Sequence, residues 1–276
     1  MKLYKTNRNI LVEQNAQYYL IEDTWDDLIH TDNLRAYLEE QLASATPYPS
    51  ALNPADILPP IGSQEIWGSG VTYFRSREAR MEEAQDAGGG DFYDKVYAAE
   101  RPEIFFKAGQ DKAVGSGQQV RIRKDSHWNV PEPELTLVIN AQGKIVGYTL
   151  GNDMSSRDIE GENPLYLPQA KTYDGSAAIG PCVWVPQEPL APSTTISLEI
   201  RRAGKLLVSG ETSISQMKRS FEELVGWLCM EMSFPQGVYL MTGTGIIPPT
   251  DFSLEVGDLI RISVAEIGVL ENTVAS

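Results

Sequence analysis

Residues 131–181 read PEPELTLVINAQGKIVGYTLGNDMSSRDIEGENPLYLPQAKTYDGSAAIGP, and this stretch is the most informative part of the chain. Its two apolar runs, LTLVI and IVGYTL, are joined by the turn signal AQG, a pattern typical of neighbouring strands in a buried sheet. Glu132 and Glu134 lie two residues apart, so on a strand their side chains leave the same face. Asp153 closes the second run. The pattern therefore predicts carboxylates at the rim of a buried sheet.

Three carboxylates gathered there are a candidate all-oxygen site for Mg²⁺, Mn²⁺ or Ca²⁺. Anions placed so close together would repel one another without a cation. The residues alone leave an alternative open, in which Glu132 and Glu134 are a solvated strand face and Asp153 is a turn residue. Pro133, between the glutamates, predicts that this strand is an edge strand or is bulged there.

Composition narrows the class of protein. The chain has 276 residues and a net charge of −15, which argues against a nucleic-acid or anionic-membrane partner, because both need a basic face. It shows no apolar run of membrane-spanning length, and its start lacks a signal-peptide core. Cys182 and Cys229, each in an apolar context, are expected to be buried free thiols. We therefore expect a cytoplasmic protein.

Short strands dominate most of the chain. Residues 1–45 predict three strands followed by a helix over residues 25–44, and the Pro-rich segment 46–62 predicts an extended linker. We place a domain boundary near Gly62. The result is a small N-terminal α+β domain with its linker (residues 1–62) and a mainly β (α+β) catalytic domain of mixed roll or barrel type (residues 63–276).

Two further helices are predicted. Residues 213–233 carry apolar side chains at helical spacing, with Ser213 and Gln216 as a capping box, and we expect this helix to pack on the core. Residues 74–86 form a polar helix before the glycines at 88–90. This helix is either a lid over a pocket or an exposed helix and loop.

Considered together and in order, the motifs resemble the fumarylacetoacetate hydrolase family, over residues 67–272. The motifs are Glu132-x-Glu134, Asp153, Arg157, Lys171 before Gly180-Pro181, Thr242-Gly243-Thr244, and Gly257-Asp258 followed by EIGVLEN. The resemblance implies a fumarylacetoacetate hydrolase-like catalytic domain. It also implies a homodimer or a dimer of dimers.

One branch of that family looks closer, the 2-keto-3-deoxy-D-arabinonate (D-xylonate) dehydratases. The strings that suggest it are EIWGSGVTY, DKVYAAERPEIFFKAG, PEPEL, ENPLYLPQAK and TGTGIIP. Family hydrolases and decarboxylases usually carry a histidine, and a glutamate three residues later, in the region near Tyr73. This chain has Ser76 where the histidine would fall. The departure favours a lyase over a hydrolase.

The resemblance implies Mg²⁺, or Mn²⁺ or Ca²⁺, held by Glu132, Glu134 and Asp153, and a small 2-oxo sugar acid as substrate. Dehydration would yield 2-oxoglutarate semialdehyde through an enolate that the metal stabilises. One alternative is a C–C hydrolase or decarboxylase that acts on an acylpyruvate or a related 2-oxo acid. Another is a metal-stabilised binding or scaffold protein without activity.

Other site residues follow by position in the motifs. Lys171 is expected as an electrostatic partner or proton carrier, the alternative being a surface lysine paired with a carboxylate. Arg157 is expected to support the acidic ligands or to hold a substrate carboxylate. The remaining candidates are Glu103 and Lys107 for acid–base or substrate contacts, Thr244 and Tyr166 as hydrogen-bond donors to substrate, with core packing as the alternative for Tyr166, and Ser69 and Ser76 as substrate contacts.

Overall fold

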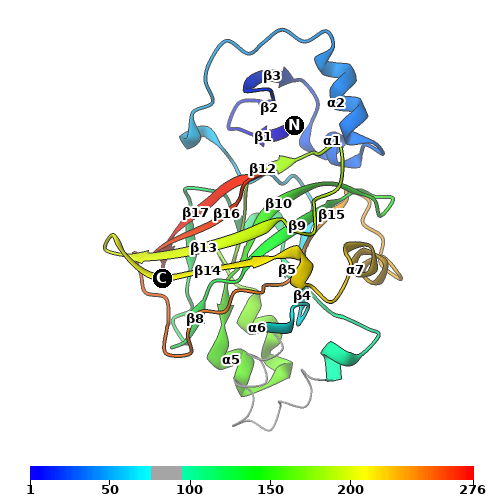
Figure 1. The fold of residues 1–276 in the computed structure, drawn as a ribbon. Helices are drawn as coiled ribbons and strands as arrows, with labels where there is room; N and C mark the ends of the chain where they lie inside the picture. The colour runs from blue at the N-terminus through cyan, green and yellow to red at the C-terminus, as the bar shows by residue number, and fades with distance from the viewer. Residues whose placement is uncertain (76–94) are drawn as a thin grey trace.

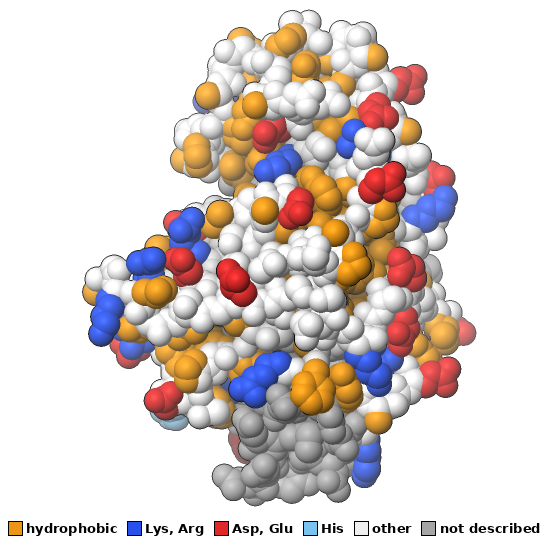
Figure 2. Space-filling model, viewed as in Figure 1, with side chains coloured by type: hydrophobic (Ala, Val, Ile, Leu, Met, Phe, Trp, Pro, Cys, Tyr) orange, Lys and Arg blue, Asp and Glu red, His pale blue; other side chains and the backbone are white. Residues whose placement is uncertain are grey.

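The computed structural model describes residues 1–75 and 95–276, and its largest element is a ten-stranded sheet (Figure 1). The strands lie in the order β3-β2-β1-β12-β10-β9-β15-β4-β5, and β6 pairs with β12. Their bounds are Lys2–Lys5 (β1), Ile10–Gln14 (β2), Gln17–Ile21 (β3), Glu65–Gly70 (β4), Glu103–Ala108 (β5), Ala113–Val114 (β6), Pro133–Ile139 (β9), Ile145–Asp153 (β10), Ala177–Trp184 (β12) and Val238–Met241 (β15). The mainly β fold class is confirmed. Acidic and basic side chains are interspersed over the face of the molecule that Figure 2 shows.

A second sheet of five strands packs against one face of the first. Its order is β14-β13-β16-β17-β7, with bounds Lys205–Ser213 (β14), Thr195–Arg202 (β13), Leu259–Val264 (β16), Gly268–Ala275 (β17) and Gln119–Arg121 (β7). Leu137 of β9 lies in one buried cluster with Leu198 and Ile262 of the second sheet. Since side chains alternate along a strand, Glu134 and Val138 of β9 lie on the opposite face. The carboxylates therefore lie on the face turned away from the second sheet.

Two helices, over residues 25–30 and 34–42, contribute Leu28 and Leu38 to a buried cluster with Val138 of β9, so they pack on the face of the large sheet turned away from the second sheet. All the described helices are short (Figure 1). Their bounds are Trp25–His30 (α1), Leu34–Leu42 (α2), Arg157–Glu162 (α5), Leu167–Lys171 (α6) and Phe221–Leu228 (α7), with 3₁₀ turns at Pro54–Asp56, Gln110–Lys112, Pro164–Tyr166 and Ile214–Gln216. A two-stranded pair, β8 (Asn129–Val130) with β11 (Ser155–Ser156), leads into α5. No helix in the described part of the chain has the length and apolarity needed to cross a bilayer.

The N-terminal strands continue the large sheet. Strand β1 pairs with β12, with Lys2 opposite Trp184, and the Trp25 indole N–H donates to the Tyr239 hydroxyl at 3.2 Å. Val138 of β9 shares a buried cluster with Trp25 and Leu28. The division of the chain at Gly62 into two domains stays a prediction.

Two predicted helices differ from the structure. The helix expected over residues 25–44 is two helices, because Asn33 starts α2 as an N-cap whose side chain accepts from the Ala36 N–H at 3.1 Å. The capping box at Ser213 is wrong, since Ser213 ends β14 opposite Thr195. The helix begins at Phe221, after Ser220, whose hydroxyl caps the Glu223 N–H at 3.1 Å. Its buried side chains include Leu224 and Leu228, so the predicted core packing is confirmed.

The prediction that β9 is an edge strand or is bulged at Pro133 is wrong. Strand β9 lies inside the sheet between β10 and β15, and Pro133 pairs in register with Asn152. The proline is tolerated because it is the first residue of β9, and β15 ends opposite Thr136, before reaching it. The predicted helix over residues 74–86 and the glycines at 88–90 fall almost wholly outside the described residues.

Candidate active site

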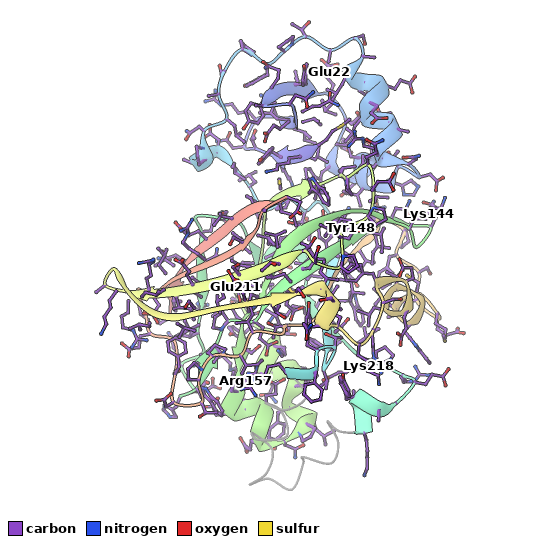
Figure 3. The ribbon with its side chains drawn as sticks, in the orientation of Figure 1. Glu22, Lys144, Tyr148, Arg157, Glu211 and Lys218 are labelled. Carbon is purple, nitrogen blue, oxygen red and sulfur yellow. The ribbon has the colours of Figure 1, made fainter. Side chains whose placement is uncertain are left out.

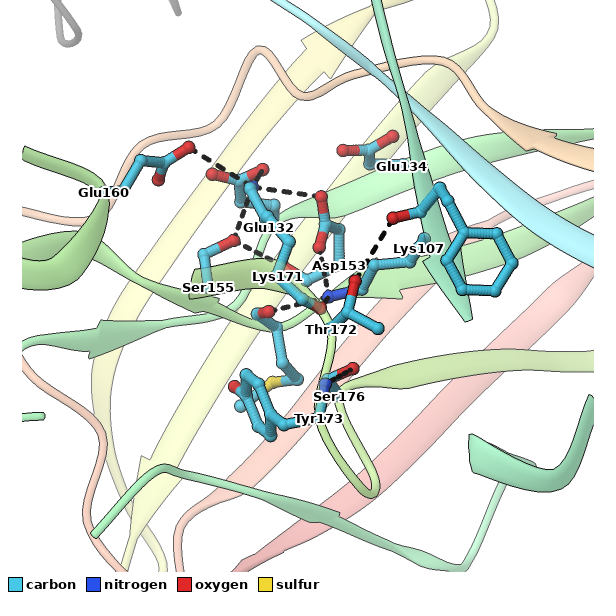
Figure 4. Close-up of polar contacts among 12 residues, drawn as sticks. Lys107, Glu132, Glu134, Asp153, Ser155, Glu160, Lys171, Thr172, Tyr173 and Ser176 are labelled. Carbon is cyan, nitrogen blue, oxygen red and sulfur yellow. Dashed lines mark hydrogen bonds and ion pairs between the residues drawn. The ribbon is translucent and has the colours of Figure 1, made fainter. Parts of the chain in front are cut away.

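Three buried carboxylates meet where β9 begins and β10 ends. The Glu132 N–H donates to the Asp153 carbonyl at 3.2 Å, and the Asp153 N–H donates to the Glu132 carbonyl at 3.0 Å. This pairing sets their side chains next to each other, and Glu134 follows on the same face. Carboxylate oxygens of Glu132, Glu134 and Asp153 all lie within 4.8 Å of one another (Figure 4). We call these three residues the carboxylate cluster.

Lys171, at the end of α6, lies at the centre of the site and is almost fully buried. Its ammonium donates to Glu132 Oε2 at 2.7 Å, to Asp153 Oδ2 at 3.0 Å and to the Ser155 hydroxyl at 2.6 Å. The three N–H bonds of a lysine ammonium are thus all used. The alternative of a surface lysine is wrong.

Two more buried cations hold the cluster from outside. Arg157 begins α5 and donates from Nη2 to Glu132 Oε1 at 2.6 Å. Lys107 of β5 forms an ion pair with Asp153 Oδ1 at 2.6 Å and donates to the Met154 and Lys171 carbonyls. Burial lowers the pKa of Lys107, and the Asp153 carboxylate opposes that shift.

Glu134 differs from the other two carboxylates because, among the described residues, it has no cationic partner. Its Oε2 accepts from the Gly243 N–H at 2.6 Å, and Figure 4 draws no contact from it to another side chain. Burial, with repulsion from Asp153 and Glu132, raises the pKa of Glu134 well above its usual range. A divalent cation beside Glu134 would remove this penalty, and three carboxylates are oxygen donors of the kind that Mg²⁺ prefers. The residues present therefore fit the predicted metal.

A small pocket opens onto the cluster. Its lining residues are Ser69, Gly70, Val71, Phe105, Glu132, Arg157, Lys171, Gly243 and Thr244. Ser69 is buried, and its hydroxyl has no hydrogen-bond partner among the described residues. Thr244 is also buried, and its hydroxyl donates to the Ile246 carbonyl at 3.3 Å. Both side chains are therefore placed to meet a ligand in the pocket.

A family model described as fumarylacetoacetate (FAA) hydrolase C-terminal matches residues 66–275 of this chain. The chain belongs to the fumarylacetoacetate hydrolase family. Within this family it is 45% identical over 218 residues to a probable 2-keto-3-deoxyxylonate dehydratase of Haloferax volcanii, which covers 79% of this chain and 74% of the relative. It is 43% identical over 221 residues to a 2-dehydro-3-deoxy-D-arabinonate dehydratase of Saccharolobus solfataricus, with the same coverage of both chains.

Solved structures agree with this placement in the fumarylacetoacetate hydrolase family. A 2-keto-3-deoxy-D-arabinonate dehydratase complexed with magnesium and 2,5-dioxopentanoate superimposes with a TM-score of 0.85 at 33% sequence identity. The match covers 99% of this chain and 98% of that one. The predicted membership of the family and the predicted closeness to its dehydratase branch are both confirmed.

The other predicted site residues lie at different distances from the pocket. Glu103 faces Gly70, which lines the pocket, across the β4–β5 pair. Tyr166 is 37% exposed and does not line the pocket, so its alternative role in the core is wrong and its substrate contact stays a prediction. Ser76 lies outside the described residues.

Sequence reasoning missed three contributors to the site. Ser155 accepts from Lys171, and Glu160 of α5 is buried with its Oε1 4.0 Å from the Lys171 ammonium. Phe105 lies under the same ammonium, 5.6 Å from nitrogen to ring centre. The spacing of Arg157 and Glu160, three residues apart on one helix face, was an available signal for Glu160.

Proposed function

We propose that this chain dehydrates 2-keto-3-deoxy-D-arabinonate (2-keto-3-deoxy-D-xylonate) to 2-oxoglutarate semialdehyde, which is 2,5-dioxopentanoate. The carboxylate cluster holds Mg²⁺, with Mn²⁺ or Ca²⁺ as substitutes of the same ligand preference. The observation that carries the proposal is the buried carboxylate of Glu134, which lacks a cationic partner among the described residues, in a chain 43% and 45% identical to two dehydratases of this substrate class.

Charge balance supports a metal together with an anionic substrate. Glu160 adds a fourth buried carboxylate to the cluster, and three buried cations face them: Lys107, Arg157 and Lys171. With these seven buried groups ionised, and with the part-exposed Glu103 left out of the count, the site keeps one net negative charge. A divalent ion turns this into one net positive charge, which the single carboxylate of a 2-oxo acid neutralises. Since buried charge is costly unless it is compensated, the site suits the two ligands bound together.

The reaction removes one proton from C3 and hydroxide from C4. A hydrogen then moves from C5 to C3, and the hydroxyl proton on the C5 oxygen moves to C4, which gives the aldehyde. A divalent ion in the site supplies Lewis-acid polarisation of the keto group, which acidifies the C3 protons. The Lys171 nitrogen lies 2.6 to 3.0 Å from oxygens of Ser155, Glu132 and Asp153, and the residue lines the pocket. We therefore assign to Lys171 the transfer of a proton to the leaving hydroxyl.

Glu103 is our candidate for the base at C3. It lies beside the pocket and outside the carboxylate cluster, and it projects over Gly70, where a Cβ atom would fall 2.0 Å from Glu103 Oε2. Glycine at position 70 thus leaves room for the carboxylate. Ser69 and Thr244 would bind substrate oxygens. Arg157 would hold Glu132 in place, and Lys107 would do the same for Asp153.

The proposal is tested by turnover of a defined substrate. Purified protein with Mg²⁺ and 2-keto-3-deoxy-D-arabinonate should form the semialdehyde, followed by NAD(P)H production in a coupled semialdehyde dehydrogenase assay. A chelator should stop the reaction, and added Mg²⁺ should restore it. Turnover of an acylpyruvate without dehydration of the sugar acid would instead establish the hydrolase alternative.

We also propose a homodimer or a dimer of dimers in the cytoplasm. Support for this assembly comes from membership of the fumarylacetoacetate hydrolase family, whose resemblance implies it. Cys182 and Cys229 are both free thiols, which suits a reducing compartment. Light scattering on a sizing column would contradict the assembly if it gave the mass of one chain, 30.5 kDa.

A further inference from the structure

A short segment before α7 holds two walls of the pocket at once. We call residues 217–219 the clamp segment. Tyr73 forms a β-bridge with Met217, and the Lys218 N–H donates to the Thr72 carbonyl at 2.9 Å. These contacts fix the chain directly after Ser69–Val71, which lines the pocket. The Lys218 side chain, labelled in Figure 3, donates to the Tyr97 carbonyl on the chain that leads to β5.

Arg219 makes the strongest contacts of the clamp segment. Its guanidinium is buried, with 4% of the side chain exposed, and it donates to the carbonyls of Val96 at 3.3 Å, Ala99 at 2.8 Å and Glu100 at 2.8 Å. These carbonyls belong to a helical turn over residues 95–98 and to the chain that leaves it. Arginine suits this place because its planar fork offers five donors to the unpaired carbonyls of a helix end. Glu223 of α7 accepts from the same guanidinium and orients it.

Little chain separates these carbonyls from Glu103. Arg101 stacks on the Trp227 ring of α7, with 4.4 Å from its guanidinium carbon to the ring centre. Pro102 is buried and has a fixed φ angle. Strand β5 then begins at Glu103, opposite Gly70. Only two residues separate Glu100 from Glu103, and one of them is the stiff Pro102, so a shift of Glu100 would pass to the Glu103 carboxylate.

We infer that Arg219 is a positioning residue that sets the Glu103 carboxylate over the pocket, an inference that rests on the proposed function. Arg219 does not line the pocket and touches none of the carboxylate cluster. It acts through the chain from Val96 to Glu103, and its loss leaves the metal ligands in place. A displaced base lowers the rate of proton removal more than it lowers substrate or metal binding.

The test compares Arg219→Met with Arg35→Met. Arg35 is a matched control because it also pairs with a glutamate four residues later, Glu39, and donates to a carbonyl, that of Val185, but it lies on α2. In Arg219→Met, kcat should fall on the order of 100-fold, with KM and the Mg²⁺ dissociation constant nearly unchanged. Arg35→Met should keep the wild-type kcat. Amide hydrogen exchange in residues 103–107 should rise in Arg219→Met alone.

The decisive experiment repeats the Arg219 substitution in a protein that already carries Glu103→Gln. If Arg219 acts through Glu103, adding Arg219→Met to Glu103→Gln lowers kcat by less than about twofold, because coupled residues are not additive. The inference is overturned by an equal loss of kcat in both backgrounds, by wild-type kcat in Arg219→Met, or by a parallel loss of Mg²⁺ affinity. If Arg219→Met does not fold, Arg219→Lys replaces it, since one ammonium cannot span the three carbonyls.

If the proposed function is wrong, the experiments give a different set of results. A wild-type protein that binds Mg²⁺ but does not dehydrate the sugar acid contradicts the function. The hydrogen-exchange comparison then still decides the inference, because it reports the order of β5 without turnover. Unchanged exchange in residues 103–107 of Arg219→Met would overturn the positioning role.

Discussion

Glu134 differs from the other two carboxylates of the cluster in the partners that it has. The other two carboxylates have lysine or arginine partners at 2.6 to 3.0 Å, whereas Glu134 accepts only from the Gly243 backbone among the described residues. Its raised pKa follows from burial and from repulsion by its two neighbours. A buried carboxylate charge that lacks a cationic partner destabilises the metal-free fold. Glu134 is therefore the residue whose removal best separates metal binding from folding.

Glu134→Gln should abolish dehydration and weaken Mg²⁺ binding while keeping the fold. Saturating Mg²⁺, at about 100 times its dissociation constant, should stabilise the wild type by about 2.7 kcal/mol and the variant much less. Without metal, the variant should melt at the wild-type temperature or above it, because the repulsion is gone. Calorimetric melting with and without Mg²⁺ measures both effects, with Glu222→Gln on the exposed side of α7 as control. A variant with wild-type metal affinity would contradict the ligand set.

The two cysteines should react differently in the folded protein. Cys182 is fully buried on β12, where burial raises the pKa of its thiol to about 12, and Cys229 is half-buried at the end of α7. At pH 8 a thiol reagent should label Cys229 slowly and reach Cys182 only in denaturant. Two labels on the native protein would show that β12 opens readily.

The same pKa shift gives a stability prediction with a definite sign. Burial raises the pKa of the Cys182 thiol to about 12, so above the pKa of an unfolded thiol, about 8.5, the folded state retains a proton that the unfolded state loses. The contribution of this thiol is complete below the unfolded pKa and decreases as the pH rises toward 12. In Cys182→Ala, the alkaline decline in urea midpoint should be smaller than in the wild type.

At the scale of elements, the central strands leave room for only one residue type at position 151. A Cβ atom on Gly151 of β10 would fall 2.4 Å from Thr136 Oγ1 and 3.0 Å from Met241 Cε. Thr136 is on β9 and Met241 on β15, so three neighbouring strands meet there, beside the carboxylate cluster. Separating them would disturb both the core and the site.

Gly151→Ala should therefore lower the free energy of unfolding by about 1–3 kcal/mol, because overpacking forces side chains and backbone apart. Gly226→Ala is the matched control. Gly226 lies inside α7, and no described atom lies within 4 Å of the point where an alanine Cβ would sit, so alanine should stabilise the helix by about 0.4–1 kcal/mol. Urea denaturation of both variants measures the difference. Equal effects of the two substitutions would contradict the packing argument.

At the scale of the whole molecule, the first sixty-odd residues are joined to the remainder by backbone pairing and by a shared core. Strand β1 extends the large sheet through β12, and Trp25 and Leu28 pack with Val138 of β9. Contacts of this kind favour one cooperative unit over two. The predicted boundary at Gly62 divides the chain along its sequence. Whether the two segments also unfold separately can be measured.

Calorimetry of the full chain should show a single transition whose van't Hoff and calorimetric enthalpies agree. Residues 63–276 expressed alone should aggregate or melt far lower, because the buried side chains of Ile179 and Val183 would lose their cover. Two separate transitions, or a stable isolated 63–276 fragment, would instead support two domains.

Local sequence pattern was enough to predict the main strands and a candidate metal site at the three carboxylates, and the motifs in order showed the resemblance to the family. Strands β9 and β10 are joined by a short turn, so local alternation was enough to bring Glu132 and Glu134 near Asp153. Only the tertiary structure decided that Lys107 pairs with Asp153, that β1 joins β12, and that Arg219 holds the chain before Glu103. The physical reason is that periodicity and turn signals report local geometry. Pairings between residues far apart in the chain depend on how the whole sheet closes.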